Sequence, residues 1–113
     1  MANNRIGRIN EEIQRELSSL IRSLKDPRVH GLVSITNVDT TSDLRHAKVF
    51  VSVLDQSDMT EVIDGLKSSA GYLRRELGHA LSLRYTPQLH FVQDDSIEKG
   101  TQILKLLNDL EKS

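Results

Sequence analysis

Residues 32–54 of this chain read LVSITNVDTTSDLRHAKVFVSVL, and this stretch decides the fold. Over residues 46–54, small and β-branched apolar side chains occupy every second position, which is typical of a β-strand that faces a core on one side. The side chains expected on that buried face are Ala47, Val49, Val51 and Val53. Residues 32–40 are also rich in β-branched side chains, and a polar turn follows them at 41–43. The two segments therefore predict an antiparallel hairpin.

Helical patterns lie on both sides of this hairpin. Apolar residues recur at spacings of three and four over residues 5–24, and Pro27 ends the pattern because the residue before a proline is pushed out of helical geometry. A second, longer apolar stripe covers residues 58–81 and starts at Asp58-Met-Thr-Glu61, a sequence typical of a capping box. Gly71 lies within this stripe and weakens a helix by about 1 kcal/mol relative to alanine, so we predict a kink or a helix in two parts there.

The remaining segments complete one small domain. Residues 83–87 are expected to form a connector, residues 88–93 a third short strand, and Ser96 the N-cap of a final helix at about 96–111. The predicted order is therefore α-β-β-α(kinked)-β-α. The hairpin and a third strand, which follows a helical crossover connection, make a small mixed three-stranded sheet with helices packed on it. The predicted fold class is α+β, in a single domain over residues 1–113.

Composition excludes several classes of protein. The chain has no cysteine, which excludes disulfides, thiolate metal sites and thiol catalysis. Apolar runs are too short to cross a membrane, and residues 1–17 lack the apolar core of a signal peptide, so we expect a cytoplasmic protein without membrane contact. The net charge is only −1, yet residues 65–93 carry four Lys or Arg side chains against one glutamate. This uneven distribution is consistent with a basic face, although ordinary scatter of charges is the alternative.

The sequence lacks the residue patterns of common catalytic sites. The four histidines, at positions 30, 46, 79 and 90, have neither the i,i+4 spacing nor the HExxH arrangement of a metal site. There is no glycine-rich nucleotide motif, no P-loop lysine and no nucleophile elbow. Asp94 and Asp95 precede the expected helix at Ser96, where acidic side chains favour the helix dipole. We therefore predict no enzyme and no bound metal, cofactor or small-molecule substrate.

The kinked helix carries the strongest functional pattern. On a continuous helix, Gly71 would share a face with Lys67, Arg74 and Arg75, so that a spot without a side chain would lie among cations. Glycine lets a ligand approach the peptide groups, and a helix break frees N–H donors, so a phosphate could bind there. A solvated charged face with a tolerated glycine is the alternative. Aromatic residues are few, so nucleic acid would be bound mainly through its backbone and shape.

These residues are part of a longer series of short motifs. In chain order the series is Asp26-Pro27-Arg28, Asp43-Leu44, Ala47-Lys48-Val49, Val51-Ser52-Val53, Ser69-Ala70-Gly71, Leu73-Arg74 and Leu83-Arg84, followed by Pro87, Leu89, Phe91 and Asp94. With these motifs in register from about residue 5 to residue 107, the chain resembles the ribosome-binding factor A family of bacterial small-subunit assembly factors. No single motif is specific, but their common order over nearly the whole chain is a strong match.

The resemblance implies a KH-like domain of type II, in which a short Ala-x-Gly kink between two helices replaces the usual GxxG loop. Ser69 stands at the first position of this kink, and we expect the kink to persist because serine is also small. The resemblance further implies binding to free small (30S) ribosomal subunits and 16S rRNA during late maturation, a part in 5′-end processing and in cold adaptation, and no catalysis. A maturation GTPase is the implied release partner, and we expect a monomer.

The residues expected to contact RNA phosphates are Lys25, Arg28, Lys67, Arg74, Arg75 and Arg84. Ser69 and Gly71 are expected to shape the kink. The segment Asp26-Pro27-Arg28 has an equally plausible structural role, since a proline and its neighbours can end a helix and anchor a turn. A hypothesis of another class is a protein-interaction module, in which the acidic stretch 39–64 and the last helix meet a protein partner. Such a complex would be insensitive to ribonuclease.

Overall fold

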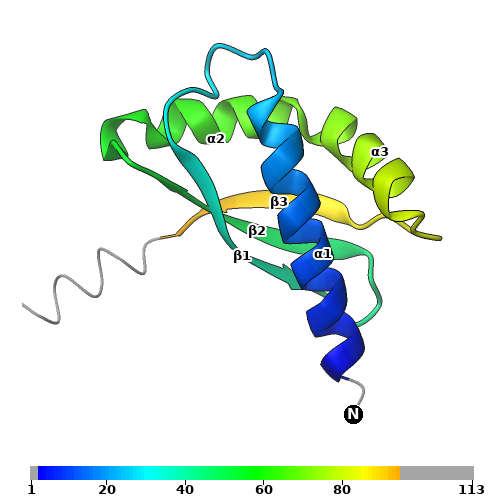
Figure 1. Cartoon of the computed structure of the whole chain (residues 1–113). Helices are drawn as coiled ribbons and strands as arrows, with labels where there is room; N and C mark the ends of the chain where they lie inside the picture. Colours follow the sequence, from blue (N-terminus) through cyan, green and yellow to red (C-terminus); the bar gives the residue numbers. More distant parts are fainter. Residues whose placement is uncertain (1–2, 95–113) are drawn as a thin grey trace, which may run out of the picture.

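Three helices and three strands make up the part of the chain that this computed structural model describes, residues 3–94 (Figure 1). The helices are α1 (Asn3–Arg22), α2 (Met59–Ser68) and α3 (Ala70–Leu81), and the strands are β1 (Val33–Thr40), β2 (His46–Val53) and β3 (Gln88–Gln93). The order predicted for these elements is confirmed, whereas the helix predicted at 96–111 with Ser96 as its cap lies outside the described residues. Within 3–94, no helix combines the length and the apolar character needed to cross a membrane.

The strands form one mixed sheet in the order β1-β2-β3. β1 and β2 are antiparallel, with Val33 opposite Val53 and Thr40 opposite Ala47, so the predicted hairpin is confirmed. β3 pairs with the other edge of β2 in the parallel sense, with His46 opposite Gln88. A parallel neighbour requires a long crossover, and α2 and α3 supply it.

β1 departs from strict alternation because it contains a bulge. The register with β2 shifts between Ile35 and Asn37, so Thr36 is an extra residue in the strand. The buried side chains Ile35 and Val38 are consequently three positions apart, although both face the core. Sequence alternation alone predicts neither this shift nor the change of face that it causes.

The core lies between the sheet and the helices. Ala47, Val49 and Val51 of β2 are fully buried, as predicted, and they join a single apolar cluster with all three helices. The helical members of this cluster are Ile13, Leu17, Ile21, Met59, Val62, Leu66, Leu73 and Leu77. Lys48, between two of the buried strand residues, is exposed, so the helices cover one face of the sheet. Figure 1 shows α1 running across that face.

The long helical stripe is divided at Ser69, two residues before the position predicted for the kink. Ser69 has φ −93° and ψ 1°, and it is both the C-cap residue of α2 and the N-cap residue of α3. Gly71 lies in the first turn of α3, and a Cβ atom built on it would have nothing within 4 Å. The break is therefore confirmed, and the serine at the kink preserves it as expected, but the local conformation at Ser69 forms it and Gly71 does not.

The helix start predicted at Asp58 is confirmed, because Asp58 is the N-cap residue of α2, but the capping box predicted there with Glu61 is wrong. Asp58 precedes α2, but its side chain makes no cap hydrogen bond. A side-chain cap hydrogen bond forms one element earlier: a short 3-10 turn, η1 (Gln56–Asp58), leads into α2, and Asp55 caps that turn by accepting from the Ser57 N–H at 3.0 Å. The Asp58 carboxylate is thereby left for contacts with another part of the chain.

Candidate nucleic-acid interface

A basic hollow opens between α3 and the connector that leads to β3. Its lining residues are Gly71, Arg74, Arg75, Arg84, Tyr85 and Thr86. We call this surface the basic hollow. Among residues 3–94, three arginines and no carboxylate face it, and the exposed backbone of Gly71 lies beside them. Guanidinium groups are planar, permanently charged donors that match the oxygens of a phosphate, so the hollow has the chemistry of a site for nucleic-acid backbone.

The fold builds the hollow by pressing the connector against α3. Ser82 ends α3 in the left-handed conformation with φ 50°, which turns the chain back along the helix. Gly78 then permits close contact, because a Cβ atom there would overlap the Oγ1 atom of Thr86. Pro87 is fully buried at the far end of the connector. Arg84, ten residues beyond Arg74 in the sequence, is thus held on the same surface.

Two contacts orient the side chains of the hollow. The Nε of Arg74 donates to the backbone carbonyl oxygen of Thr86 at 3.1 Å, which leaves the rest of the guanidinium group for a ligand. The Cζ of Arg84 lies 5.6 Å from the centre of the Tyr85 ring, within cation–π range. Tyr85 itself is 69% exposed, so its ring offers a surface on which a base could stack.

A second hollow adjoins the first and shares Arg74, Tyr85 and Thr86 with it. Its other lining residues are Asp43, Leu44, Arg45, His46 and Gln88. Arg45 is a cation that the sequence analysis missed. It arrives here because the backbone N–H of Gln88 donates to the Arg45 carbonyl oxygen at 2.8 Å, where parallel pairing of β2 and β3 begins. Only knowledge of that pairing could have placed Arg45 beside Arg74.

The structure divides the residues predicted to bind RNA into two sets. Arg74, Arg75 and Arg84 converge on the basic hollow with Gly71. Lys67 is exposed on α2 and does not line the hollow, because the break at Ser69 ends the continuous helical face on which Lys67 and Gly71 were expected to lie together. Lys25 and Arg28 belong to the loop between α1 and β1 and do not line it either.

The segment Asp26-Pro27-Arg28 forms a tight turn. Arg28 donates to the Asp26 carboxylate from Nε at 3.0 Å, from Nη2 at 2.7 Å and from its backbone N–H at 2.9 Å. These hydrogen bonds lower the pKa of Asp26 from 3.8 to about 2. The structural alternative for this segment is therefore confirmed as a turn anchor, while RNA contact by Arg28 stays a prediction.

Histidines also meet in ways that their sequence spacing does not indicate. His46 and His90, on the exposed face of neighbouring strands, have their Nδ1 and Nε2 atoms 3.0 Å apart. His30 lies near Asp58 and Glu61 at the start of α2. Both groupings arise from tertiary contacts between distant segments, so no local spacing of residues in the sequence indicates them.

Over almost its whole length the chain is similar to proteins named ribosome-binding factor A. The sequence pattern described as ribosome-binding factor A matches residues 5–107. Ribosome-binding factor A of Clostridium novyi (strain NT) is 50% identical over 114 residues, which cover 99% of this chain and 94% of that protein. The protein of the same name from Acetivibrio thermocellus is 53% identical over 107 residues, which cover 93% and 87% of the two chains. The resemblance expected over residues 5–107 is confirmed.

Two structures share the fold. The solution NMR structure of a Thermotoga maritima protein described as a ribosome binding factor A has a TM-score of 0.70 at 29% identity, over 80% of this chain and 87% of that one. A homology model of Thermus thermophilus ribosome binding factor A, fitted into a cryo-EM map of a 30S complex, has a TM-score of 0.65 at 22% identity, over 76% and 91%. The predicted α+β, KH-like fold is confirmed by this likeness.

Proposed function

This chain belongs to the ribosome-binding factor A family, and from that premise we propose that it binds the free small (30S) ribosomal subunit through 16S rRNA during late maturation. The description of the Thermus relative names a complex with 30S, which supports the proposal for a chain of the same fold. The proposed role includes 5′-end processing of 16S rRNA and importance in the cold. In this proposal the protein is a cytoplasmic monomer that acts by binding, without catalysis and without a cofactor. A maturation GTPase is the proposed release partner.

The observation that carries the proposal is the convergence of Arg74, Arg75 and Arg84 around the open backbone of Gly71. Each guanidinium group can donate two parallel hydrogen bonds to one phosphate, and no carboxylate from the described part of the chain lines the surface on which the three lie. Phosphate contacts of this kind fix the position and orientation of a protein on RNA without reading the sequence. The exposed ring of Tyr85 adds a stacking surface for one unpaired base.

The proposed mechanism is that the protein binds one conformation of the RNA more tightly than the others. A protein that binds phosphates in one arrangement shifts the RNA population toward that arrangement, by as much as its affinity for the two states differs. Misfolded RNA helices are harder to escape at low temperature, so the same bias matters most in the cold.

The experiment is sedimentation of the purified chain with isolated small subunits and with complete ribosomes, at low and moderate salt. We expect selective pelleting with small subunits, weakening as salt rises, and loss of it in a variant with Arg75→Ala and Arg84→Ala. A variant with Arg8→Ala and Arg15→Ala removes two exposed arginines of α1 and is the matched control. Equal pelleting of both variants, or complexes that survive ribonuclease, would reject the proposal in favour of a protein-interaction module.

A further inference from the structure

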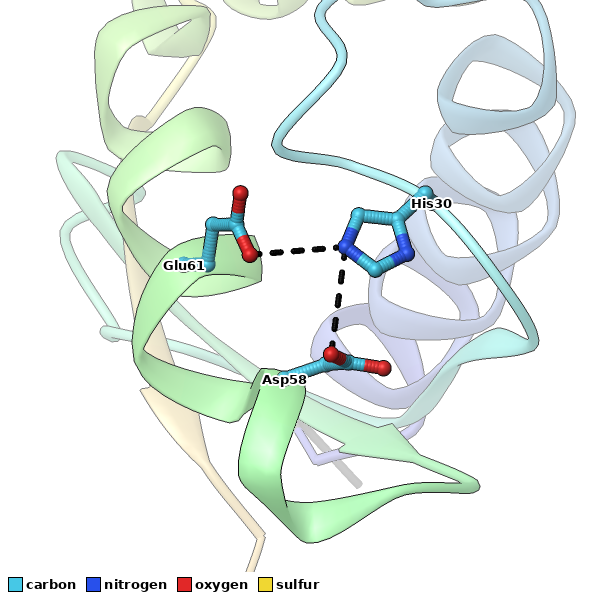
Figure 2. A group of neighbouring side chains, drawn as sticks. All are labelled: His30, Asp58 and Glu61. Atoms are coloured by element: carbon cyan, nitrogen blue, oxygen red, sulfur yellow. Dashed lines mark hydrogen bonds and ion pairs between the residues drawn. The ribbon is translucent and has the colours of Figure 1, made fainter.

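A cluster of three side chains outside the basic hollow joins the loop after α1 to the start of α2. The Nε2 atom of His30 lies 3.5 Å from the Oε2 atom of Glu61 and 3.9 Å from the Oδ1 atom of Asp58 (Figure 2). One ligand atom from each of the three residues fits within 4.8 Å of the other two. The side chains of His30, Asp58 and Glu61 are 44%, 30% and 55% exposed, so a dissolved ion can reach them.

The two carboxylates are placed by the way α2 begins. Asp58 and Glu61 are three residues apart at the first turn, which puts them on one side of the helix. Asp58 stands where an aspartate normally accepts a backbone N–H, yet it makes no such cap hydrogen bond. Its carboxylate points instead toward the imidazole of His30, as Figure 2 shows.

The histidine is placed by close packing of its loop on α2. A Cβ atom on Gly65 would lie 2.7 Å from Cγ2 of Val29 and 3.0 Å from Cβ of Arg28, so only a glycine allows the loop to come this near. On the other side of His30, Gly31 turns the chain into β1 with φ 74°. Packing on Gly65 thus fixes the path of the backbone before His30, and the conformation of Gly31 fixes it after His30. The imidazole ring consequently lies over the first turn of α2.

We propose that His30, Asp58 and Glu61 bind one divalent transition-metal ion of the zinc class. One imidazole and two carboxylates form a mixed nitrogen and oxygen set that suits Zn²⁺ and its neighbours, whereas the hard ions Ca²⁺ and Mg²⁺ prefer oxygen ligands and gain little from an imidazole nitrogen. With metal–ligand bonds of about 2.0–2.2 Å, two ligands of a tetrahedral ion lie about 3.3–3.6 Å apart. The two distances from His30, 3.5 Å and 3.9 Å, are already near that spacing, and the two carboxylate oxygens, within 4.8 Å of each other, would move closer by side-chain rotation. Water would complete the fourth position.

The bound ion would fasten the loop 23–32 to α2. This link matters because the domain is small and has no disulfide to restrain its loops. The same loop holds the turn in which Arg28 is bonded to Asp26, so the ion would also fix the position of that arginine. The positive charge of Arg28 also interacts with the carboxylates of Glu61 and Asp64. Arg28 therefore balances part of the negative charge near the site, and the ion would balance the rest.

The test is titration of chelator-treated protein with Zn²⁺, followed by calorimetry, thermal unfolding and NMR of the histidine rings. We expect a single site, a rise in Tm of several degrees at saturation, and the strongest shift at Nε2 of His30. Mg²⁺ or Ca²⁺ at the same concentration should produce none of these changes. His30→Gln, Asp58→Asn and Glu61→Gln should each weaken Zn²⁺ binding at least about tenfold.

Two controls separate this site from others. His79→Gln changes an exposed histidine of α3, and His46→Gln removes a partner of the His46–His90 pair, which is the competing nitrogen site. Both variants should bind Zn²⁺ as the parent chain does. Loss of binding in His46→Gln, unchanged binding in His30→Gln, or no ring shift at His30 in the unsubstituted protein would each overturn the proposal. The last measurement needs no variant and therefore does not depend on how a variant folds.

Discussion

The Nε atom of Arg74 donates a hydrogen bond to the backbone carbonyl oxygen of Thr86 across 3.1 Å and so ties α3 to the connector before β3. Arg74 is therefore both a candidate phosphate ligand and a support of the hollow in which the phosphate would lie. Arg75, the next residue, lines the same hollow. Substitution can distinguish the two arginines, because Arg74 contributes both its charge and the hydrogen bond to Thr86, whereas the prediction for Arg75 concerns its charge.

Alanine at both positions should weaken binding to small subunits and to 16S rRNA and lower the slope of log affinity against log salt by about 2, because two phosphate contacts are lost. Arg74→Ala alone should also lower the free energy of unfolding by about 0.5–1.5 kcal/mol, the usual net value of one hydrogen bond. Affinity across a salt series and chemical denaturation measure the two effects. An unchanged salt slope in the double variant would show that these arginines do not meet phosphates.

Close contact between Gly78 and Thr86 should make the helix intolerant of a side chain at position 78. In Gly78→Ala the new methyl group overlaps Oγ1 of Thr86, which should reduce the free energy of unfolding by about 1–3 kcal/mol despite the better helix propensity of alanine. Adding Thr86→Ala removes the overlapping atom, so the double variant should recover most of the loss. Thermal unfolding of the four proteins gives the coupling, and purely additive effects would contradict it.

At Gly71 the same substitution should have the opposite effect on stability. A Cβ atom there meets nothing within 4 Å, so Gly71→Ala should raise the free energy of unfolding by up to about 1 kcal/mol. If a phosphate approaches the backbone at this point, the added methyl group should lower the affinity for 16S rRNA while the protein becomes more stable. Affinity and Tm measured on one preparation decide the matter, and unchanged affinity would exclude a backbone contact at Gly71.

The sequence predicted the elements that depend on local pattern. Alternation of Ala47, Val49 and Val51 indicated the buried face of β2 correctly, and the helix before Pro27 ends at Arg22, two residues before the predicted end. The bulge at Thr36 was not predictable, because it exists only relative to the partner strand. The helix break was displaced from Gly71 to Ser69 for a related reason: a glycine lowers the cost of a kink but does not fix its position.

The candidate site was predicted where its residues are close in sequence and missed where pairing brings them together. Arg74 and Arg75 are adjacent on α3, and family motifs added Arg84. Arg45 reaches the neighbouring hollow through the parallel pairing of β2 with β3, and His30 reaches α2 through the contact at Gly65. No periodicity in the sequence encodes these approaches.

Acid should destabilise the turn at Asp26. The pKa of this carboxyl is lowered from 3.8 to about 2, chiefly by the hydrogen bonds from the Arg28 side chain. Between about pH 4 and pH 2 the unfolded chain takes up a proton here that the folded chain does not, so the free energy of unfolding falls as the pH falls. Hydrogen bonds from Thr41 and Ser57 lower the pKa values of Asp43 and Asp55, which contribute in the same direction.

Asp26→Asn should therefore make the stability of the protein less dependent on pH below about 4, as well as lowering it at neutral pH. Denaturation at several pH values measures both effects. Glu12→Gln, which removes an exposed carboxylate of α1, is the control for the loss of one negative charge. A pH dependence that is equally steep in Asp26→Asn and in the parent chain would contradict the assignment of this effect to Asp26.

Ser69 should tolerate replacement by alanine, the residue that the family resemblance implies at this position of the kink. Its side chain makes no cap hydrogen bond to α3, and its backbone joins the two helices: the Ser69 N–H donates to the carbonyl oxygens of Gly65 and Leu66 at 3.1 Å, and its own carbonyl oxygen accepts from the Leu73 N–H at 2.9 Å. Ser69→Ala should consequently change the free energy of unfolding by less than about 0.5 kcal/mol and leave the affinity for 16S rRNA unchanged. Thermal unfolding and the rRNA binding assay test both statements. A clear fall in affinity without a change in Tm would instead assign the Ser69 hydroxyl a direct contact with RNA.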